Sequence, residues 1–172
     1  MAETDSAGCS EGVEPSVPVS RDISIGLVVT CYSPERLPDM LTLIDSIARQ
    51  KAAIDEVVVV VQQSRELREA LEPALAGLTQ TQVTVRFLET ARGVSRARNE
   101  GVGAVGTDVV AFVDDDTELF DDWVAMTRAF YREQPQAIGA AGAILPAWDN
   151  PAMQWFPREL YWMLSCTYWT WT

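Results

Sequence analysis

The chain has 172 residues, 48% of them hydrophobic, with 13 Lys and Arg against 25 Asp and Glu and a formal net charge of -12 at pH 7. This length and composition predict one globular domain with a single core, and the acidic balance argues against a nucleic-acid partner. The sequence contains no histidine, which excludes Ser-His-Asp and Cys-His catalysis and histidine-bound zinc, so any chemistry depends on carboxylates, hydroxyls, arginines or a metal ion.

The first 20 residues are small, polar and acidic, and no basic residue precedes Arg21. This composition predicts a disordered acidic leader over residues 1–20, since it lacks the positive start and apolar segment of a secretory signal. The sequence also lacks the run of ~20 apolar residues that a membrane span needs. Three widely spaced cysteines without a CxxC pair favour a reducing compartment, so we expect a cytoplasmic location.

From residue 23 onward, short runs of β-branched residues alternate with helical patterns, which is typical of an α/β fold with a mostly parallel, buried sheet. Strands are predicted at residues 23–30, 56–61, 83–89, 109–113 and 138–145, the last of them rich in Gly and Ala. Helices are predicted at residues 38–50, 65–76, 95–105 and 121–133, with Ser95 as the cap of the third.

Three consecutive aspartates, Asp114, Asp115 and Asp116, directly follow the strand predicted at 109–113. The carboxyl ends of strands in an open α/β sheet border the ligand crevice, so we expect these side chains at a binding site. Two carboxylates ~4 Å apart repel by about 4 kcal/mol at an effective dielectric near 20, which favours either a raised pKa or a bound divalent cation. Carboxylate oxygens suit Mg²⁺ or Mn²⁺. The alternative is that the aspartates cap the next helix.

The segment from Arg92 to Asn99 is the one concentration of basic residues in the sequence, with Arg96 and Arg98 in the first turns of a predicted helix. Helix N-termini attract anions, and basic residues there oppose the helix dipole. An anionic ligand or acidic neighbours would explain these arginines. An ordinary surface cluster of ion pairs is the alternative.

The sequence GVGAVG at 101–106 matches the dinucleotide-binding pattern GxGxxG, but it is predicted to close a helix and precede a strand. A dinucleotide site needs the opposite order, so we interpret this segment as a helix end and turn. The exit of the first predicted strand, Thr30 to Pro34, has no glycine, yet its hydroxyls and the Tyr32 ring could hold a base and a ribose.

In their order, these segments resemble the nucleotide-sugar-binding half of a family 2 glycosyltransferase with a GT-A fold. The similarity covers residues 23–145: a strand ending in Thr-Cys-Tyr-Ser-Pro, a strand of valines, Arg-Gly-x-Ser-x-Ala-Arg-Asn, and Ala-Phe-Val-Asp-Asp-Asp. The resemblance implies a Rossmann-like sheet, a nucleotide-diphosphate sugar donor, Mg²⁺ or Mn²⁺, and an acceptor hydroxyl on a glycan or a lipid-linked oligosaccharide.

The resemblance also implies roles for individual residues, but it assigns no catalytic base. The donor-binding residues would be Thr30, Tyr32, Gln62, Arg92, Ser95, Arg98, Asn99, Asp114 and Asp115, and the metal-binding residues would be Asp114 and Asp116. One departure concerns the end of the second predicted strand. The family usually has a base-reading Asp there, whereas this chain has Gln62, Gln63 and Ser64, whose amides can still hydrogen-bond a base.

The C-terminal segment differs from the rest because four of the six tryptophans lie between residues 155 and 172. Such a density of aromatic residues usually packs against a surface or lies at a membrane interface. The segment is similar to one in a prokaryotic subset that modifies polyprenyl- or dolichyl-phosphate-linked sugars, where Gly would replace Ser165. We expect a GT-A domain at residues 21–150 and, at 151–172, the start of a missing acceptor-side region. The segment would contact that region or the cytoplasmic membrane face.

Two other classes of function are alternatives to a glycosyltransferase. A receiver-like signalling domain needs acidic residues after the first strand and a lysine late in the sheet, whereas the single lysine here is Lys51. A truncated, non-catalytic nucleotide-binding or interaction module fits the same motifs. It would bind a nucleotide without transferring a sugar.

Overall fold

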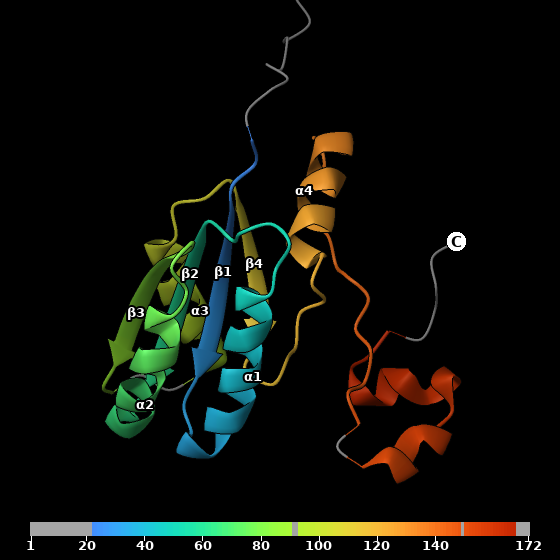
Figure 1. Cartoon of the computed structure of the whole chain (residues 1–172), viewed down its shortest axis with the longest axis horizontal. Coiled ribbons are helices and arrows are strands. Elements are labelled where there is room, and N and C mark those ends of the chain that lie inside the picture. The colour runs from blue at the N-terminus through green and yellow to red at the C-terminus, as the bar shows by residue number, and fades with distance from the viewer. Residues whose placement is uncertain (1–21, 91–92, 149, 168–172) are drawn as a thin grey trace, which may run out of the picture. The chain divides into compact units, whose positions relative to one another are not determined.

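The computed structural model describes residues 22–90, 93–148 and 150–167 (Figure 1). The leader predicted at 1–20 lies outside these residues. The chain divides into two compact units, Met1–Glu133 and Gln134–Thr172. Residues 134–150, which the sequence analysis joined to the larger domain, group with the C-terminal segment.

Within the described residues, the larger unit contains one sheet of four parallel strands in the order β3-β2-β1-β4. The strands are β1 (Ile25–Cys31), β2 (Glu56–Gln62), β3 (Gln82–Leu88) and β4 (Val109–Asp114). The helices are α1 (Leu37–Ala48), α2 (Arg65–Ala76), α3 (Val94–Ala104) and α4 (Trp123–Glu133), and the 3₁₀ turn η1 (Pro34–Arg36) precedes α1. The predicted parallel α/β fold is confirmed, with the first four predicted strands and all four helices in place.

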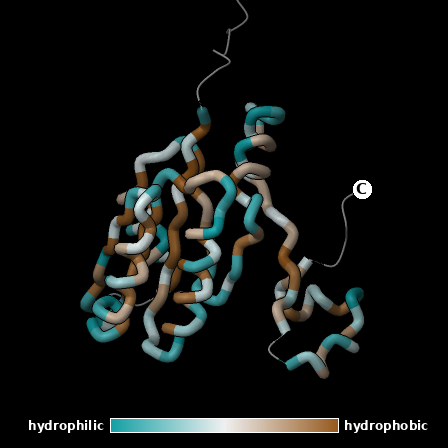
Figure 2. The backbone as a smooth tube through the Cα atoms, in the orientation of Figure 1, coloured by the Kyte–Doolittle hydropathy of each residue, from teal (hydrophilic) through white to brown (hydrophobic). Residues whose placement is uncertain are grey.

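The central strands are buried on both faces because helices cover both sides of the sheet. On one face, β1 and β2 pack against α1 and α2 through a large cluster that includes Leu27, Val29, Val57, Val59, Met40, Leu43, Leu67 and Leu71. On the other face, Val28, Val58 and Val60 pack against Ala97 of α3. Figure 2 shows this concentration of hydrophobic residues along β1 and β2. The continuous valine run of β2 is therefore explained by burial on both sides.

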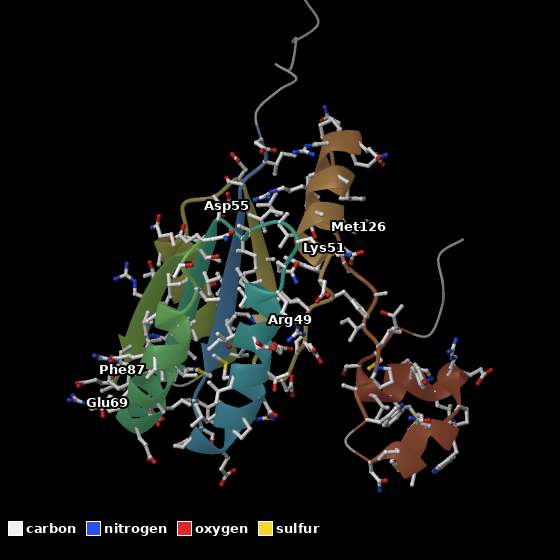
Figure 3. The ribbon with its side chains drawn as sticks, in the orientation of Figure 1. Arg49, Lys51, Asp55, Glu69, Phe87 and Met126 are labelled. Carbon is white, nitrogen blue, oxygen red and sulfur yellow. The ribbon has the colours of Figure 1, made fainter. Side chains whose placement is uncertain are left out.

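The end of α1 fixes the segment that follows the three aspartates. The fully buried Ser46 hydroxyl accepts a hydrogen bond from the Leu119 N–H at 3.1 Å. The Gln50 amide donates to the Phe120 carbonyl at 2.8 Å and accepts from the Val124 N–H at 3.1 Å. Arg49, which is labelled in Figure 3, donates to Glu118 at 2.7 Å. The acidic loop is thus held by β4 on one side and by α1 on the other.

The smaller unit corrects one prediction, because residues 138–145 form no strand. This segment is mostly Gly and Ala, and the Ile138 side chain is fully exposed. A strand needs neighbouring strands and side chains to pack, and the described residues provide neither for this segment. The described residues of this unit instead form two 3₁₀ helices, η2 (Pro151–Trp155) and η3 (Arg158–Leu164).

Aromatic contacts link the two short helices of the smaller unit. The Phe156 ring stacks on Tyr161 with centroids 6.4 Å apart and lies 6.0 Å from Trp148. Trp155 and Trp162 nevertheless remain 71% and 59% exposed. Over the described residues of both units, no helix is long and apolar enough to cross a bilayer.

Candidate functional site

A pocket of about 190 Å³ lies at the carboxyl edge of the sheet, where β1, β2 and β4 end. The register of the strands explains its position, since Thr30 of β1 pairs with Asp114 of β4. The described lining residues are Thr30, Tyr32, Gln62, Val94, Asp114, Asp115 and Asp116. The structure thus brings together six of the residues that the sequence analysis selected.

A second hollow of about 390 Å³ shares Tyr32 and Gln62 with this pocket and is also lined by Gln63 and Gly93. Gln62 is only 6% exposed, whereas the Tyr32 ring is 64% exposed. Gln63 has a positive φ of 61° and Gly93 has one of 112°, so the chain bends sharply where both residues line the hollow. The two hollows together are lined by one aromatic ring, two side-chain amides and three carboxylates.

Two arginines pair with the first and third aspartates. The Arg98 guanidinium donates to Asp114 Oδ1 at 2.7 Å. The central carbon of the same guanidinium, Cζ, lies 5.8 Å from the centre of the Phe112 ring. The Arg36 guanidinium donates to Asp116 Oδ2 at 3.3 Å. Arg36 is not among the site residues predicted from the sequence. The one feature that could have indicated it is its position as a basic residue shortly after the first strand.

The fold disfavours the charged form of Asp115. Burial raises the pKa of Asp115 above its ordinary value, Arg36 lowers it, and the nearby carboxylates of Asp116, Asp114 and Asp39 raise it again. The net shift is upward. The raised pKa that the sequence analysis gave as one of two options is therefore found at the middle aspartate.

Replacing Asp115 by Asn is expected to stabilise the folded chain at neutral pH by less than about 1 kcal/mol, after allowance for solvent screening. An acid whose pKa is raised on folding loses stability as the pH increases from its unfolded value towards its folded value. The neutral amide avoids this cost. Urea unfolding of both proteins at several pH values would measure the difference, which should vanish below the unfolded pKa of ~3.8. An equal difference at all pH values would contradict this origin.

Cys31 lies next to the site at the end of β1 but is not a nucleophile. Burial, followed by the charge of Asp115, raises the pKa of its thiol to about 12. The thiolate is the reactive form of cysteine, so this side chain stays protonated and inert near neutral pH. Its role is to pack in the core.

The start of α3 differs in part from its prediction. The helix begins at Val94 after Gly93, so Ser95 already lies in the first turn and is not the cap. Ser95 and Asn99 are exposed on α3, and neither belongs to the described lining of the two hollows. Arg92 lies outside the described residues. The GVGAVG segment ends α3 and precedes β4, which confirms that it does not open a dinucleotide-binding helix.

The chain matches the family model described as glycosyl transferase family 2 over residues 27–166. It belongs to this family. A curated relative, the glucosyl-dolichyl phosphate glucuronosyltransferase of Haloferax volcanii, is 28% identical over 144 residues, which are 84% of this chain and 45% of the relative. The chain thus spans less than half the length of that curated relative.

Two solved structures share the fold. The S. aureus TarS 1–349 structure in complex with UDP is 19% identical, with a TM-score of 0.57 over 73% of this chain and 40% of that one. The mannosyltransferase PcManGT of Pyrobaculum calidifontis, in complex with GDP-Man and Mn²⁺, is 17% identical, with a TM-score of 0.56 over 77% and 37%. The GT-A fold expected from the sequence is confirmed.

The carboxylates that line the pocket have donor atoms that suit a divalent cation. Asp114 and Asp116 present carboxylate oxygens to the pocket, and Mg²⁺ or Mn²⁺ prefers such ligands. Among the described residues, no three acidic or Cys side chains are gathered as a closed metal cage. Mg²⁺ commonly binds one or two carboxylates and completes its shell with water and substrate phosphates. The pocket therefore suits a cation that arrives with a phosphate ligand.

Proposed function

We propose that this chain forms the donor site of a glycosyltransferase that uses a nucleotide-diphosphate sugar, with Mg²⁺ or Mn²⁺, and transfers the sugar to an acceptor hydroxyl. One observation carries the proposal. The pocket at the carboxyl edge joins Thr30, Tyr32 and Gln62 to the three aspartates, and this chemistry matches the parts of such a donor.

The nucleoside would bind at the hollow shared by Tyr32 and Gln62. The exposed Tyr32 ring offers a face on which a base can stack, and the Gln62 amide offers both a donor and an acceptor to the base edge. The Thr30 hydroxyl lies at the adjoining pocket. Because the family's usual base-reading Asp is Gln here, the site would lack the charge-assisted hydrogen bond that a carboxylate makes to a base N–H.

The diphosphate would lie between the aspartates and the start of α3. Arg98 already reaches Asp114, and Val94 in the first turn of α3 lines the pocket, so the N–H groups of that turn would be available to a phosphate. Ser95 lies in the same turn and belongs to the predicted set, although it does not line the pocket. Arg92 and Asn99 complete the predicted set. Asp115 would help to bind the donor beside the metal-binding pair.

Transfer breaks the bond between the anomeric carbon and the diphosphate oxygen and forms a bond to the acceptor oxygen. A divalent cation held by Asp114 and Asp116 would stabilise the negative charge on the departing nucleoside diphosphate. Arg98 adds positive charge at the same side of the pocket. By family resemblance, the acceptor attacks from the opposite face and inverts the anomeric carbon. We assign none of the described residues as the base that accepts the hydroxyl proton.

A lipid-linked acceptor is supported by the Haloferax volcanii relative, whose name gives glucosyl-dolichyl phosphate as its substrate. The smaller unit also exposes Trp155, Trp162 and Met163, at 71%, 59% and 60%. Exposed tryptophans suit a contact with a membrane interface or with a further protein domain. A peripheral position at the cytoplasmic membrane face is therefore part of the proposal.

Calorimetry of the purified chain with UDP, GDP, CDP and ADP, with and without Mn²⁺, tests the donor site. We expect one nucleoside diphosphate to bind, and to bind more tightly with Mn²⁺. A folded chain that binds none of the four would overturn the proposal. Mn²⁺-dependent binding without transfer, when the sugar nucleotide and a dolichyl-phosphate-linked sugar are supplied, would favour the non-catalytic binding module.

Replacing Arg98 by Ala is expected to weaken binding of that nucleoside diphosphate about tenfold, since a hydrogen bond to a charged group contributes about 1.5 kcal/mol. Binding of the matching nucleoside, which has no phosphate, should change little. Calorimetry with both ligands gives the comparison. Arg96→Ala is the matched control because Arg96 is an exposed arginine of the same helix. Equal losses for nucleoside and diphosphate would remove Arg98 from the phosphate site.

A further inference from the structure

Asp116 shares one guanidinium nitrogen with a second carboxylate. Arg36 Nη1 donates to Asp116 Oδ2 at 3.3 Å and to Asp39 Oδ2 at 3.2 Å. Arg36 ends the turn η1 and occupies the N-cap position of α1, and Asp39 lies in the first turn of that helix. The hydrogen bond from Arg36 therefore links the loop after β1 to the acidic loop after β4.

This contact opposes a cation at Asp116. A carboxylate carries one negative charge spread over both oxygens, so a guanidinium on Oδ2 weakens the attraction of the whole group for a second cation. An arginine side chain is protonated throughout the ordinary pH range, so Arg36 carries its positive charge in the absence of any ligand. The positive charge at Asp116 is thus always present when no ligand is bound.

The same contact can be released at low cost. The side chains of Arg36 and Asp116 are 40% and 54% exposed, so both can move without leaving a packed core. When Asp116 turns to another cation, Asp39 still accepts from Arg36 within the same segment. Arg36 then keeps Asp39 as its partner, and Asp116 is paired with the new cation.

We propose that Arg36 is the internal counter-cation of Asp116 and antagonises a divalent cation there until the donor diphosphate binds. This inference rests on the proposed function for its biological meaning. A diphosphate adds negative charge to the pocket, which lets Arg36 and the metal ion remain together. Arg36 thereby makes metal binding depend on the nucleotide, and by linkage the nucleotide's affinity depends on the metal by the same factor.

The direct test is the affinity of the full chain for Mn²⁺ alone, measured from the paramagnetic resonance signal of free Mn²⁺. Arg36→Gln is expected to bind Mn²⁺ about three- to fivefold more tightly than the parent chain, the size of an exposed ion pair. Arg49→Gln is the control, since it removes the same charge from the other end of α1, where Arg49 pairs with Asp45 and Glu118. Buffers at ~0.15 M salt screen effects beyond about 8 Å. Equal changes in the two variants would overturn the inference.

A second variant is expected to change the Mn²⁺ affinity in the opposite direction. Asp39→Asn weakens the second acceptor of Arg36, so Arg36 should hold Asp116 more firmly and Mn²⁺ affinity should fall. Asp45→Asn, which removes a charge elsewhere on α1, is its control. Mn²⁺ binding that is unaffected by Asp39→Asn, or absent from all variants, would contradict the inference.

The role of the nucleotide is measured by repeating the Mn²⁺ titration with saturating UDP, or with whichever diphosphate binds. In the parent chain, the nucleotide should increase the Mn²⁺ affinity by a certain ratio. We expect this ratio to be smaller in Arg36→Gln, because the Mn²⁺ affinity without nucleotide is already higher in that variant. An unchanged ratio would reject the coupling. If no diphosphate binds the parent chain, the proposed function fails, while the Mn²⁺ titrations still decide whether Arg36 antagonises the cation.

Discussion

Replacing Asp116 by Asn should reduce the Mn²⁺-dependent affinity for a nucleoside diphosphate about 100-fold, or ~2.7 kcal/mol. Asp116 is one of two carboxylates that face the pocket as candidate metal ligands. An amide of nearly the same shape has no charge with which to hold a divalent cation, so the loss exceeds that of an ordinary hydrogen bond. Calorimetry with and without Mn²⁺ measures the effect, and nucleotide binding without metal should fall far less.

Glu118→Gln is the matched control for this prediction. Glu118 lies in the same loop and loses the same charge, but its carboxylate accepts from Arg49 at 2.7 Å. We expect its Mn²⁺-dependent affinity to remain within a few-fold of the parent value, and circular dichroism should show both variants folded. A metal dependence that survives Asp116→Asn would refute the assignment of this side chain as a ligand.

The sheet was predictable because each strand carries its own local signal. The five consecutive valines of β2 need burial on both faces, and a parallel sheet covered by helices supplies it. The segment at 138–145 fails for the converse reason. This segment shares with a strand only its lack of charged residues. Its Gly and Ala residues offer little side-chain surface to pack against neighbouring strands.

The site was predictable as far as strand ends define it. Thr30, Gln62 and Asp114 converge because parallel strands place their carboxyl ends at one edge. Arg36 could not be found in this way, since its contact with Asp116 depends on how the turn η1 sits against the loop after β4. The start of α3 was misjudged because a glycine with positive φ, and not a serine, leads into the helix.

Gly101, the first glycine of the GxGxxG pattern, allows α3 to lie close to β1. A Cβ atom at Gly101 would lie 2.3 Å from Cγ1 of Val28, which is 1% exposed in the core of the sheet. Real Cβ atoms do not approach so closely, and the surrounding core leaves Val28 little room to move. The glycine therefore serves helix packing against the sheet.

Gly101→Ala is accordingly expected to destabilise the fold by about 1–3 kcal/mol, the range for overpacking a core. Gly103→Ala is the control, since a Cβ atom there would meet nothing within 4 Å and alanine improves helix propensity by up to about 1 kcal/mol. Urea unfolding should therefore move the two midpoints in opposite directions. Arg98 lies one turn earlier on the same helix, so Gly101→Ala should also weaken the diphosphate affinity through the Arg98–Asp114 pair. Equal midpoints for the two variants would show that α3 tolerates the added methyl group by shifting as a unit.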